Sequence, residues 1–272
     1  MSRRGTTKVG VAGLGAIGRA VAMKLHRGEV LNVELAGVAS RDHDKARAFL
    51  SQIGSTAPVE TVEQLAARSD IVIECAPAAV FRDIAVAVLT QGKKLMALSA
   101  GQLLANEDLI GLAERGGGQI IVPTGALIGL DAVTAAAEGE IRSVTMITRK
   151  PVNGLIGAPY LARHGIEIAN LTAPLKVFAG TAREAALGFP ENVNVVAALS
   201  LAGIGADRTT IEIWADPVLQ RNVHRVVVDS DAARFEMSIE NVPSENPKTG
   251  RITGLSVLAV LRKLHAPLRV GT

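Results

Sequence analysis

The glycine motif GLGAIG constrains the fold of this chain more than any other feature. An apolar, valine-rich run at residues 8–12 leads into it, and the motif places Gly13, Gly15 and Gly18 in a GxGxxG spacing. Apolar residues then recur with helical periodicity, and a second apolar run follows at residues 33–39. This order of strand, glycine turn, helix and strand is typical of the Rossmann dinucleotide-binding unit. The alternative is a glycine turn with a purely structural role.

The three glycines of a Rossmann unit have separate tasks. The first permits a tight turn, the second lets the backbone approach a pyrophosphate, and the third lets the helix pack on the strand. The N–H groups at the start of the helix bind the phosphates. We therefore expect the cofactor pyrophosphate to be bound by Gly13, Gly15, Ala16, Ile17 and Gly18.

The end of the second strand bears on the choice of cofactor. Sites for NAD usually place Asp or Glu there, bonded to the ribose 2′-hydroxyl. In this chain Ser40 and Arg41 occupy that place, and Asp42 comes one or two positions late. Because Ser40 and Arg41 are able to bind a 2′-phosphate, the sequence favours NADP, with NAD tolerated. A solvated turn before the next helix is the alternative.

Strands and helices continue to alternate as far as residue 127, which predicts an α/β fold with a parallel, doubly wound sheet. Ligands of such sheets lie beyond the carboxyl ends of the strands. Cys75 and Ala76 are at one of these ends, so both are predicted to contact the cofactor. Cys75 would line the nicotinamide pocket, and a small buried filler is its alternative role.

The pattern changes to period two in the second half of the chain. Alternating runs with short links predict a second α/β domain with a mostly antiparallel sheet. A final apolar helix is predicted at residues 254–264. We expect a dinucleotide-binding domain at residues 1–124, a second domain at 125–245, and a segment 246–272 whose helix packs back on the first domain.

Composition excludes several classes of protein. The 272 residues include 29 basic and 26 acidic side chains, and aromatic residues make up 3%, which argues against a nucleic-acid partner. The single cysteine rules out a disulfide framework. Uncharged runs reach about 15 residues, short of the ~20 that span a membrane. With no secretory signal and no metal-ligand spacing, we expect a cytoplasmic protein without a membrane or metal partner.

Polar residues of the second half are candidates for chemistry. His224 lies in a predicted strand and is either structural or a proton acceptor, with a pKa near 6.5 in an unperturbed site. Lys150, at the end of another strand, is either solvated or holds a substrate carboxylate. Asn192 and Asn194 flank the first turn of a helix, where one could cap the helix and the other face the cofactor.

The stretch 246–254 opens the final helix. Its Lys248 and Thr249, with the early backbone amides, would form an anion cradle, and simple capping is the alternative for the threonine. Lys150, Asn192, Lys248 and Thr249 together are the candidate substrate-binding residues.

At this point the chain resembles the L-aspartate dehydrogenase family. The segments that carry the resemblance run in order along the chain: GLGAIG, PTGALIGLDA, TRKP, GFPENVNVVAALSLAGIGADRT, NVH and NPKTG. The resemblance implies an NAD(P)-dependent amino-acid dehydrogenase that interconverts L-aspartate and iminoaspartate, which hydrolyses to oxaloacetate and ammonia. It also implies a dihydrodipicolinate-reductase-like second domain, a homodimer, and a link to NAD biosynthesis through quinolinate synthase.

The resemblance also assigns roles to residues. It places the active-site histidine at His224 and the cofactor contacts at Ala126 and Asn194. Two other hypotheses stay open. One is a related two-domain reductase of the dihydrodipicolinate or homoserine type, and the other is a protein that senses NAD(P)H without turnover.

Overall fold

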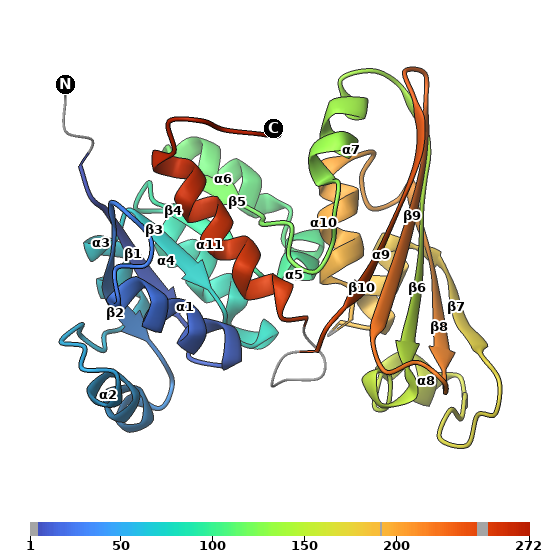
Figure 1. Cartoon of the computed structure of the whole chain (residues 1–272), viewed down its shortest axis with the longest axis horizontal. Coiled ribbons are helices and arrows are strands. Elements are labelled where there is room, and N and C mark those ends of the chain that lie inside the picture. The colour runs from blue at the N-terminus through green and yellow to red at the C-terminus, as the bar shows by residue number, and fades with distance from the viewer. Residues whose placement is uncertain (1–4, 191, 244–249) are drawn as a thin grey trace. The chain divides into compact units, whose positions relative to one another are not determined.

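The chain forms two compact units in the computed structural model (Figure 1). The structure describes residues 5–190, 192–243 and 250–272. Unit 1 comprises Met1–Pro123 and Gly254–Arg269, and unit 2 comprises Thr124–Thr253 and Val270–Thr272.

Unit 1 is built on a parallel sheet of five strands in the order β2-β1-β3-β4-β5. The strands are β1 (Thr7–Ala12), β2 (Val33–Ala39), β3 (Ile71–Glu74), β4 (Lys94–Ala97) and β5 (Gln119–Ile121). All of their pairings are parallel, which confirms the predicted doubly wound sheet. The sequence predicts that the last run of this alternation, residues 119–127, is a strand, but only Gln119–Ile121 belongs to the sheet, because the chain leaves it after Ile121 and turns at Gly125.

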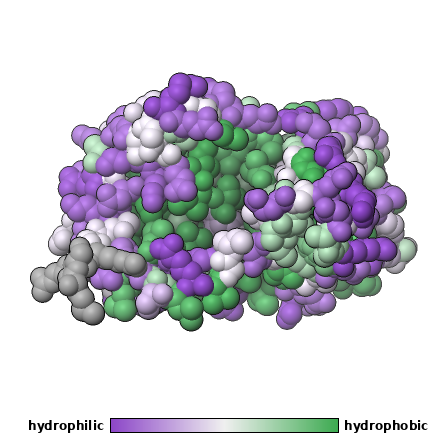
Figure 2. All heavy atoms as spheres, turned by 90° about the horizontal axis from the view of Figure 1, so that it is seen from above, coloured by the Kyte–Doolittle hydropathy of each residue, from purple (hydrophilic) through white to green (hydrophobic). Residues whose placement is uncertain are grey.

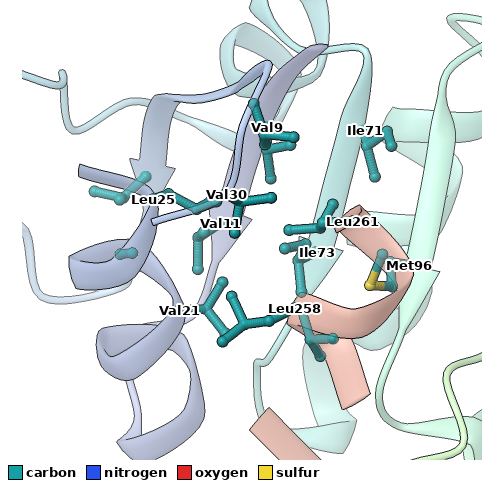
Figure 3. Close-up of a cluster of buried hydrophobic side chains, with 14 of the residues drawn as sticks. Val9, Val11, Val21, Leu25, Val30, Ile71, Ile73, Met96, Leu258 and Leu261 are labelled. Carbon is teal, nitrogen blue, oxygen red and sulfur yellow. The ribbon is translucent and has the colours of Figure 1, made fainter. Parts of the chain in front are cut away.

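Helices cover both faces of this sheet. They are α1 (Ala16–His26), α2 (His43–Gln52), α3 (Val62–Arg68), η1 (Ala78–Val80), α4 (Phe81–Leu89), α5 (Ala100–Ala105), α6 (Asp108–Gly116) and α11 (Ile252–His265). One core cluster joins the sheet to α1, α2 and α11, and a second joins it to α3, α4 and α6. Figure 3 shows Leu258 and Leu261 of α11 beside Val11 and Ile73 of the sheet. The C-terminal helix therefore completes the core of unit 1.

Unit 2 contains a second five-stranded sheet, in the order β10-β9-β6-β8-β7. Its strands are β6 (Ile141–Pro151), β7 (Leu175–Thr181), β8 (Thr209–Asp216), β9 (Asn222–Ser230) and β10 (Arg234–Asn241). Three pairings are antiparallel, as the period-two pattern predicts, while β6 and β8 run parallel. The helices that lie between β6 and β8 in the chain supply the crossover that a parallel pair needs.

The helices of unit 2 leave the two sides of its sheet in different environments. They are α7 (Leu130–Ala137), η2 (Val152–Gly154), α8 (Pro159–Arg163), α9 (Ala182–Gly188) and α10 (Asn194–Ala202). Along β6, Met146, Thr148 and Lys150 are buried, while the alternate residue Ile147 is partly exposed and Arg149 is exposed. The buried side of the sheet thus carries polar groups at the carboxyl end of β6.

Hydrophilic side chains occupy much of the surface in the view of Figure 2. Within the described part of the chain, every helix is too short or too polar to cross a membrane.

Candidate functional site

The glycine turn between β1 and α1 has the geometry that its spacing predicts. Gly13 has φ +99°, and a Cβ atom there would lie 2.6 Å from the carbonyl oxygen of Cys75. A Cβ atom on Gly18 would overlap the carbonyl oxygen of Gly13. At Gly15, by contrast, an added Cβ atom would meet nothing within 4 Å. Packing therefore requires glycine at positions 13 and 18, whereas Gly15 borders open space.

The start of α1 is suited to an anion. Its N-cap residue is Gly15, which has no side chain to satisfy the first backbone N–H groups, and its first turn contains no acidic residue. The amides of Ala16, Ile17 and Gly18 belong to this turn. Together with the open space at Gly15, they fit a dinucleotide pyrophosphate.

The end of β2 separates Asp42 from the residues before it. Asp42 is the N-cap of α2, and its carboxylate accepts a hydrogen bond of 3.0 Å from the Lys45 amide. Hydrogen bonds from Lys45 hold the pKa of Asp42 below its usual range. Ser40 is partly exposed and Arg41 is exposed. Asp42, the acidic residue nearest the expected ribose position, therefore caps α2. Ser40 and Arg41 remain as the candidates for binding the ribose.

Glu74, at the carboxyl end of β3, is a residue that sequence reasoning missed. Its side chain is fully buried and accepts hydrogen bonds from the Ala76 amide at 2.9 Å, the Ser99 amide at 3.0 Å and the Ser99 hydroxyl at 3.0 Å. Burial raises the pKa of Glu74, against the opposing effect of these donors. One carboxyl group therefore ties together the loops that follow β3 and β4.

Cys75 lies next to the glycine turn. Its carbonyl oxygen is the atom nearest to the position that a Cβ atom on Gly13 would take. Burial, and then the negative charge of Glu74, raise the pKa of the Cys75 thiol. The thiol therefore stays protonated, which suits a packing or pocket-lining role and not a nucleophile.

In unit 2 the structure brings together Thr148, Lys150 and His224, whose side chains are only 1%, 4% and 2% exposed. Thr148 of β6 lies opposite His224 of β9 in the sheet register, and its Oγ1 is 3.1 Å from Nδ1 of the imidazole. Lys150 donates a hydrogen bond of 2.7 Å to Oδ1 of Asn192, in the segment before α10. Lys150 and Asn192 therefore form the cationic part of the cluster.

His224 differs from an ordinary histidine. Burial, and then the positive charge of Lys150, lower the pKa of His224 to about 3. The imidazole is therefore neutral near pH 7, whereas the sequence alone suggested a pKa near 6.5.

Two asparagines predicted to flank a helix start do not cap it. The N-cap of α10 is Val193, without a side-chain cap, and Asn194 is the first helical residue. The prediction that Asn192 or Asn194 caps the helix is therefore wrong, because Asn192 bonds Lys150 and Asn194 lies one position too far along.

Ala126 is held by a residue that sequence reasoning also missed. Nδ2 of Asn241, the last residue of β10, donates a hydrogen bond of 2.9 Å to the Ala126 carbonyl. Oδ1 of Asn241 is buried and has no hydrogen-bond partner among the described residues. Lys248 and Thr249 lie outside the described residues. Within the described ranges, no cluster of His, Cys, Asp and Glu suits a metal ion.

The comparisons with known proteins match two family models and several curated relatives. Residues 13–123 match the model for the NAD-binding domain of homoserine dehydrogenase, and residues 131–264 match the model for the C-terminal domain of aspartate dehydrogenase. An L-aspartate dehydrogenase of Bradyrhizobium diazoefficiens is 56% identical over 97% of this chain and 94% of its own. The chain belongs to the L-aspartate dehydrogenase family.

Other members of the L-aspartate dehydrogenase family match over the same length. L-aspartate dehydrogenase 3 of Bordetella bronchiseptica is 54% identical over the whole of both chains. The solved aspartate dehydrogenase of Thermotoga maritima shares the fold, with a TM-score of 0.74 at 22% identity over 97% of this chain and 99% of its own. The expected family resemblance is therefore confirmed along the full chain.

Proposed function

We propose that this protein is an L-aspartate dehydrogenase. It oxidises L-aspartate with NAD⁺ or NADP⁺ to iminoaspartate, the reduced cofactor and a proton, and water then converts iminoaspartate to oxaloacetate and ammonia. The same enzyme catalyses the reverse reductive amination. The observation that carries the proposal is the 56% identity to a named L-aspartate dehydrogenase over nearly the whole chain.

Most of the proposed cofactor contacts are in unit 1, and two, Ala126 and Asn194, are in unit 2. The pyrophosphate is bound by the amides at the start of α1, next to the open space at Gly15. Ser40 and Arg41 bind the adenosine ribose, and the exposed guanidinium of Arg41 favours a 2′-phosphate. Cys75 and Ala76 line the site at the end of β3, and Ala126 and Asn194 make the remaining cofactor contacts. When bound, the nicotinamide supplies the hydride acceptor.

The substrate groups of the proposal are in unit 2. Aspartate carries two carboxylates, and Lys150, oriented by Asn192, provides a cation for one of them. Lys248 and Thr249 are proposed for the other. His224 contacts the reacting end of the substrate, because it is the imidazole of the same buried cluster.

We also propose a homodimer formed by the exposed side of the sheet in unit 2. Ile147, Trp214, Val223 and Val227 lie on this side and remain partly exposed. These apolar side chains share the face with Arg149, Glu212 and Arg225, which lie opposite them in the strand register. Partly exposed apolar side chains on an open sheet face are typical of an interface between copies of a chain. Light scattering is expected to give about twice the mass of the 28.3 kDa chain. Monomeric mass at micromolar concentration would contradict the dimer.

In the cell, the proposed place of the enzyme is the cytoplasm, where iminoaspartate would pass to quinolinate synthase for NAD biosynthesis. Family membership supports both the compartment and the transfer of iminoaspartate. Trapping iminoaspartate with purified quinolinate synthase would test the transfer.

The function is tested by absorbance at the nicotinamide band. The expected result is cofactor reduction with L-aspartate and little with homoserine, for NAD⁺ and NADP⁺ in turn. His224→Ala is expected to lower kcat by about 10²–10³ while the cofactor still binds. Turnover with homoserine but not aspartate would indicate the sister-reductase reading, and cofactor binding without any turnover would indicate a sensor.

A further inference from the structure

We propose that His224 meets the substrate as a neutral imidazole with its proton on Nε2, and that Thr148 is the positioning residue that fixes this tautomer. The inference rests on the proposed function, because it concerns the same buried cluster. It assigns His224 the role of a hydrogen-bond donor to a substrate oxygen, in place of a general base for the substrate ammonium.

The first support is the hydrogen bonding of Thr148. Its side chain is 1% exposed, so its hydroxyl proton needs a protein acceptor. Across the residues that the structure describes, the one hydrogen-bond partner of Oγ1 is Nδ1 of His224, at 3.1 Å. If the hydroxyl donates to Nδ1, that nitrogen carries a lone pair. In a neutral imidazole the proton is then on Nε2.

The second support is the charge around the imidazole. A catalytic histidine that stores a proton is commonly paired with a carboxylate, which stabilises the imidazolium. Here the partner is a neutral hydroxyl, the charged neighbour on β6 is Lys150, and β10 places Ile239 opposite His224. An ammonium group disfavours a second positive charge nearby. The low pKa of His224 agrees with this arrangement.

The third support is the other ring nitrogen. Nε2 of His224 makes no hydrogen bond to any residue in the described ranges. An N–H group without a protein partner, on a side chain that is only 2% exposed, is a natural donor to a ligand. The carboxylate and carbonyl oxygens of a four-carbon dicarboxylic acid are acceptors of the required kind.

This role changes the expected proton path. During aspartate oxidation the ammonium proton passes to water before the hydride leaves, and His224 stays neutral throughout. The rate of oxidation should therefore follow the titration of the substrate ammonium. It should show no limb near the ordinary histidine pKa of about 6.5.

The tautomer is measured directly by nitrogen NMR of protein labelled with ¹⁵N-histidine. The chain has five histidines, and the signals lost in His224→Asn identify His224. We expect a neutral ring protonated at Nε2 from pH 5 to pH 8. A ring protonated at Nδ1, or a ring that titrates near pH 6.5, would overturn the proposal.

The role of Thr148 is tested by a matched set of variants. Thr148→Val removes the hydroxyl and should give a mixture of tautomers, with kcat about tenfold lower and cofactor affinity unchanged. Thr148→Ser should restore both. Thr209→Val is the control, because Thr209 is a buried threonine of the neighbouring strand β8 whose hydroxyl has no partner among the described residues. It should retain the Nε2–H tautomer and the activity.

The outcomes separate this inference from the proposed function. An Nδ1–H ring in an enzyme that turns over aspartate normally rejects the tautomer and leaves the function standing. An Nε2–H ring without aspartate turnover rejects the function. If Thr148→Val does not fold, the wild-type spectrum alone decides the tautomer, and Thr148→Ser decides whether a hydroxyl is sufficient to hold it.

Discussion

Single residues decide whether this fold binds a dinucleotide, and Gly15 gives the sharpest test. Gly15→Val should abolish NADH binding in a folded protein, because the new side chain occupies the open space at the start of α1. The backbone φ of Gly15 is −71°, so valine causes no strain there. Fluorescence titration measures the affinity. Gly5→Val is the control, since Gly5 also borders open space but precedes β1; a titration of Gly15→Val that matched it would contradict the pyrophosphate assignment.

Arg41 tests the choice of cofactor at the same scale. Arg41→Ala should weaken NADPH by about 10- to 150-fold, the equivalent of about 1.5–3 kcal/mol for a hydrogen bond to a charged group, and NADH much less. Titrations with both cofactors measure the difference. Arg47→Ala is a suitable control, because Arg47 is an exposed arginine of α2 that pairs with Asp44. An equal loss of affinity for NADH and NADPH in Arg41→Ala would show that the guanidinium does not contact the 2′-phosphate.

The sequence predicted the candidate-site residues that belong to recognisable motifs. It did not predict those that join the site through contacts between distant segments of the chain. Thr148 lies 76 positions from His224 and meets it only through the register of β6 with β9. Asn241, at the end of β10, bonds the carbonyl of Ala126 in the loop before α7, across 115 positions. Glu74 did leave a signal, because it is one charged residue at the end of an otherwise apolar strand.

At the scale of elements, local patterns predicted the first Rossmann unit well. Glycine spacing and apolar periodicity located β1, α1 and β2, because both arise from short stretches of chain. The edge strand β7 was not predicted, since only two of its seven residues are buried and its pattern lacks a clean alternation. The parallel pairing of β6 with β8 was also beyond prediction, because it depends on which strands meet after a long crossover.

The helix α11 should be essential for the stability of unit 1. Leu261→Ala removes a fully buried side chain from the core cluster shown in Figure 3 and should cost about 2–5 kcal/mol. Leu255→Ala on the same helix, where the leucine is 57% exposed, should change stability by less than about 0.5 kcal/mol. Chemical denaturation measures both. Equal stabilities of the two variants would mean that α11 contributes little to this core.

At the scale of the whole molecule, the protonation of His224 makes stability depend on pH. Its pKa is about 3 in the folded protein and about 6.5 when exposed on unfolding. Between these values the unfolded chain binds the additional proton, so stability should fall as the pH decreases from 6.5 toward 3 and be fully present above 6.5.

The measurement is the melting temperature at pH 7.5 and pH 5 for wild type and His224→Asn. The wild type should lose more on acidification, because the variant has no proton to take up at this position. The same loss in both proteins would show that other groups control the acid sensitivity.

The return of α11 to the core of unit 1 has a consequence for how the protein is made. Residues up to Pro123 leave the ribosome long before residues 254–269 are synthesised, because about 130 residues lie between these two segments. At roughly 5–20 residues per second, this takes on the order of ten seconds. During that interval the nascent chain lacks the helix that covers Val11, Ile73 and Met96. The cofactor-binding unit therefore reaches its final packing only after residues 254–269 have been synthesised, so a chain released before that point carries the glycine turn on an incomplete core.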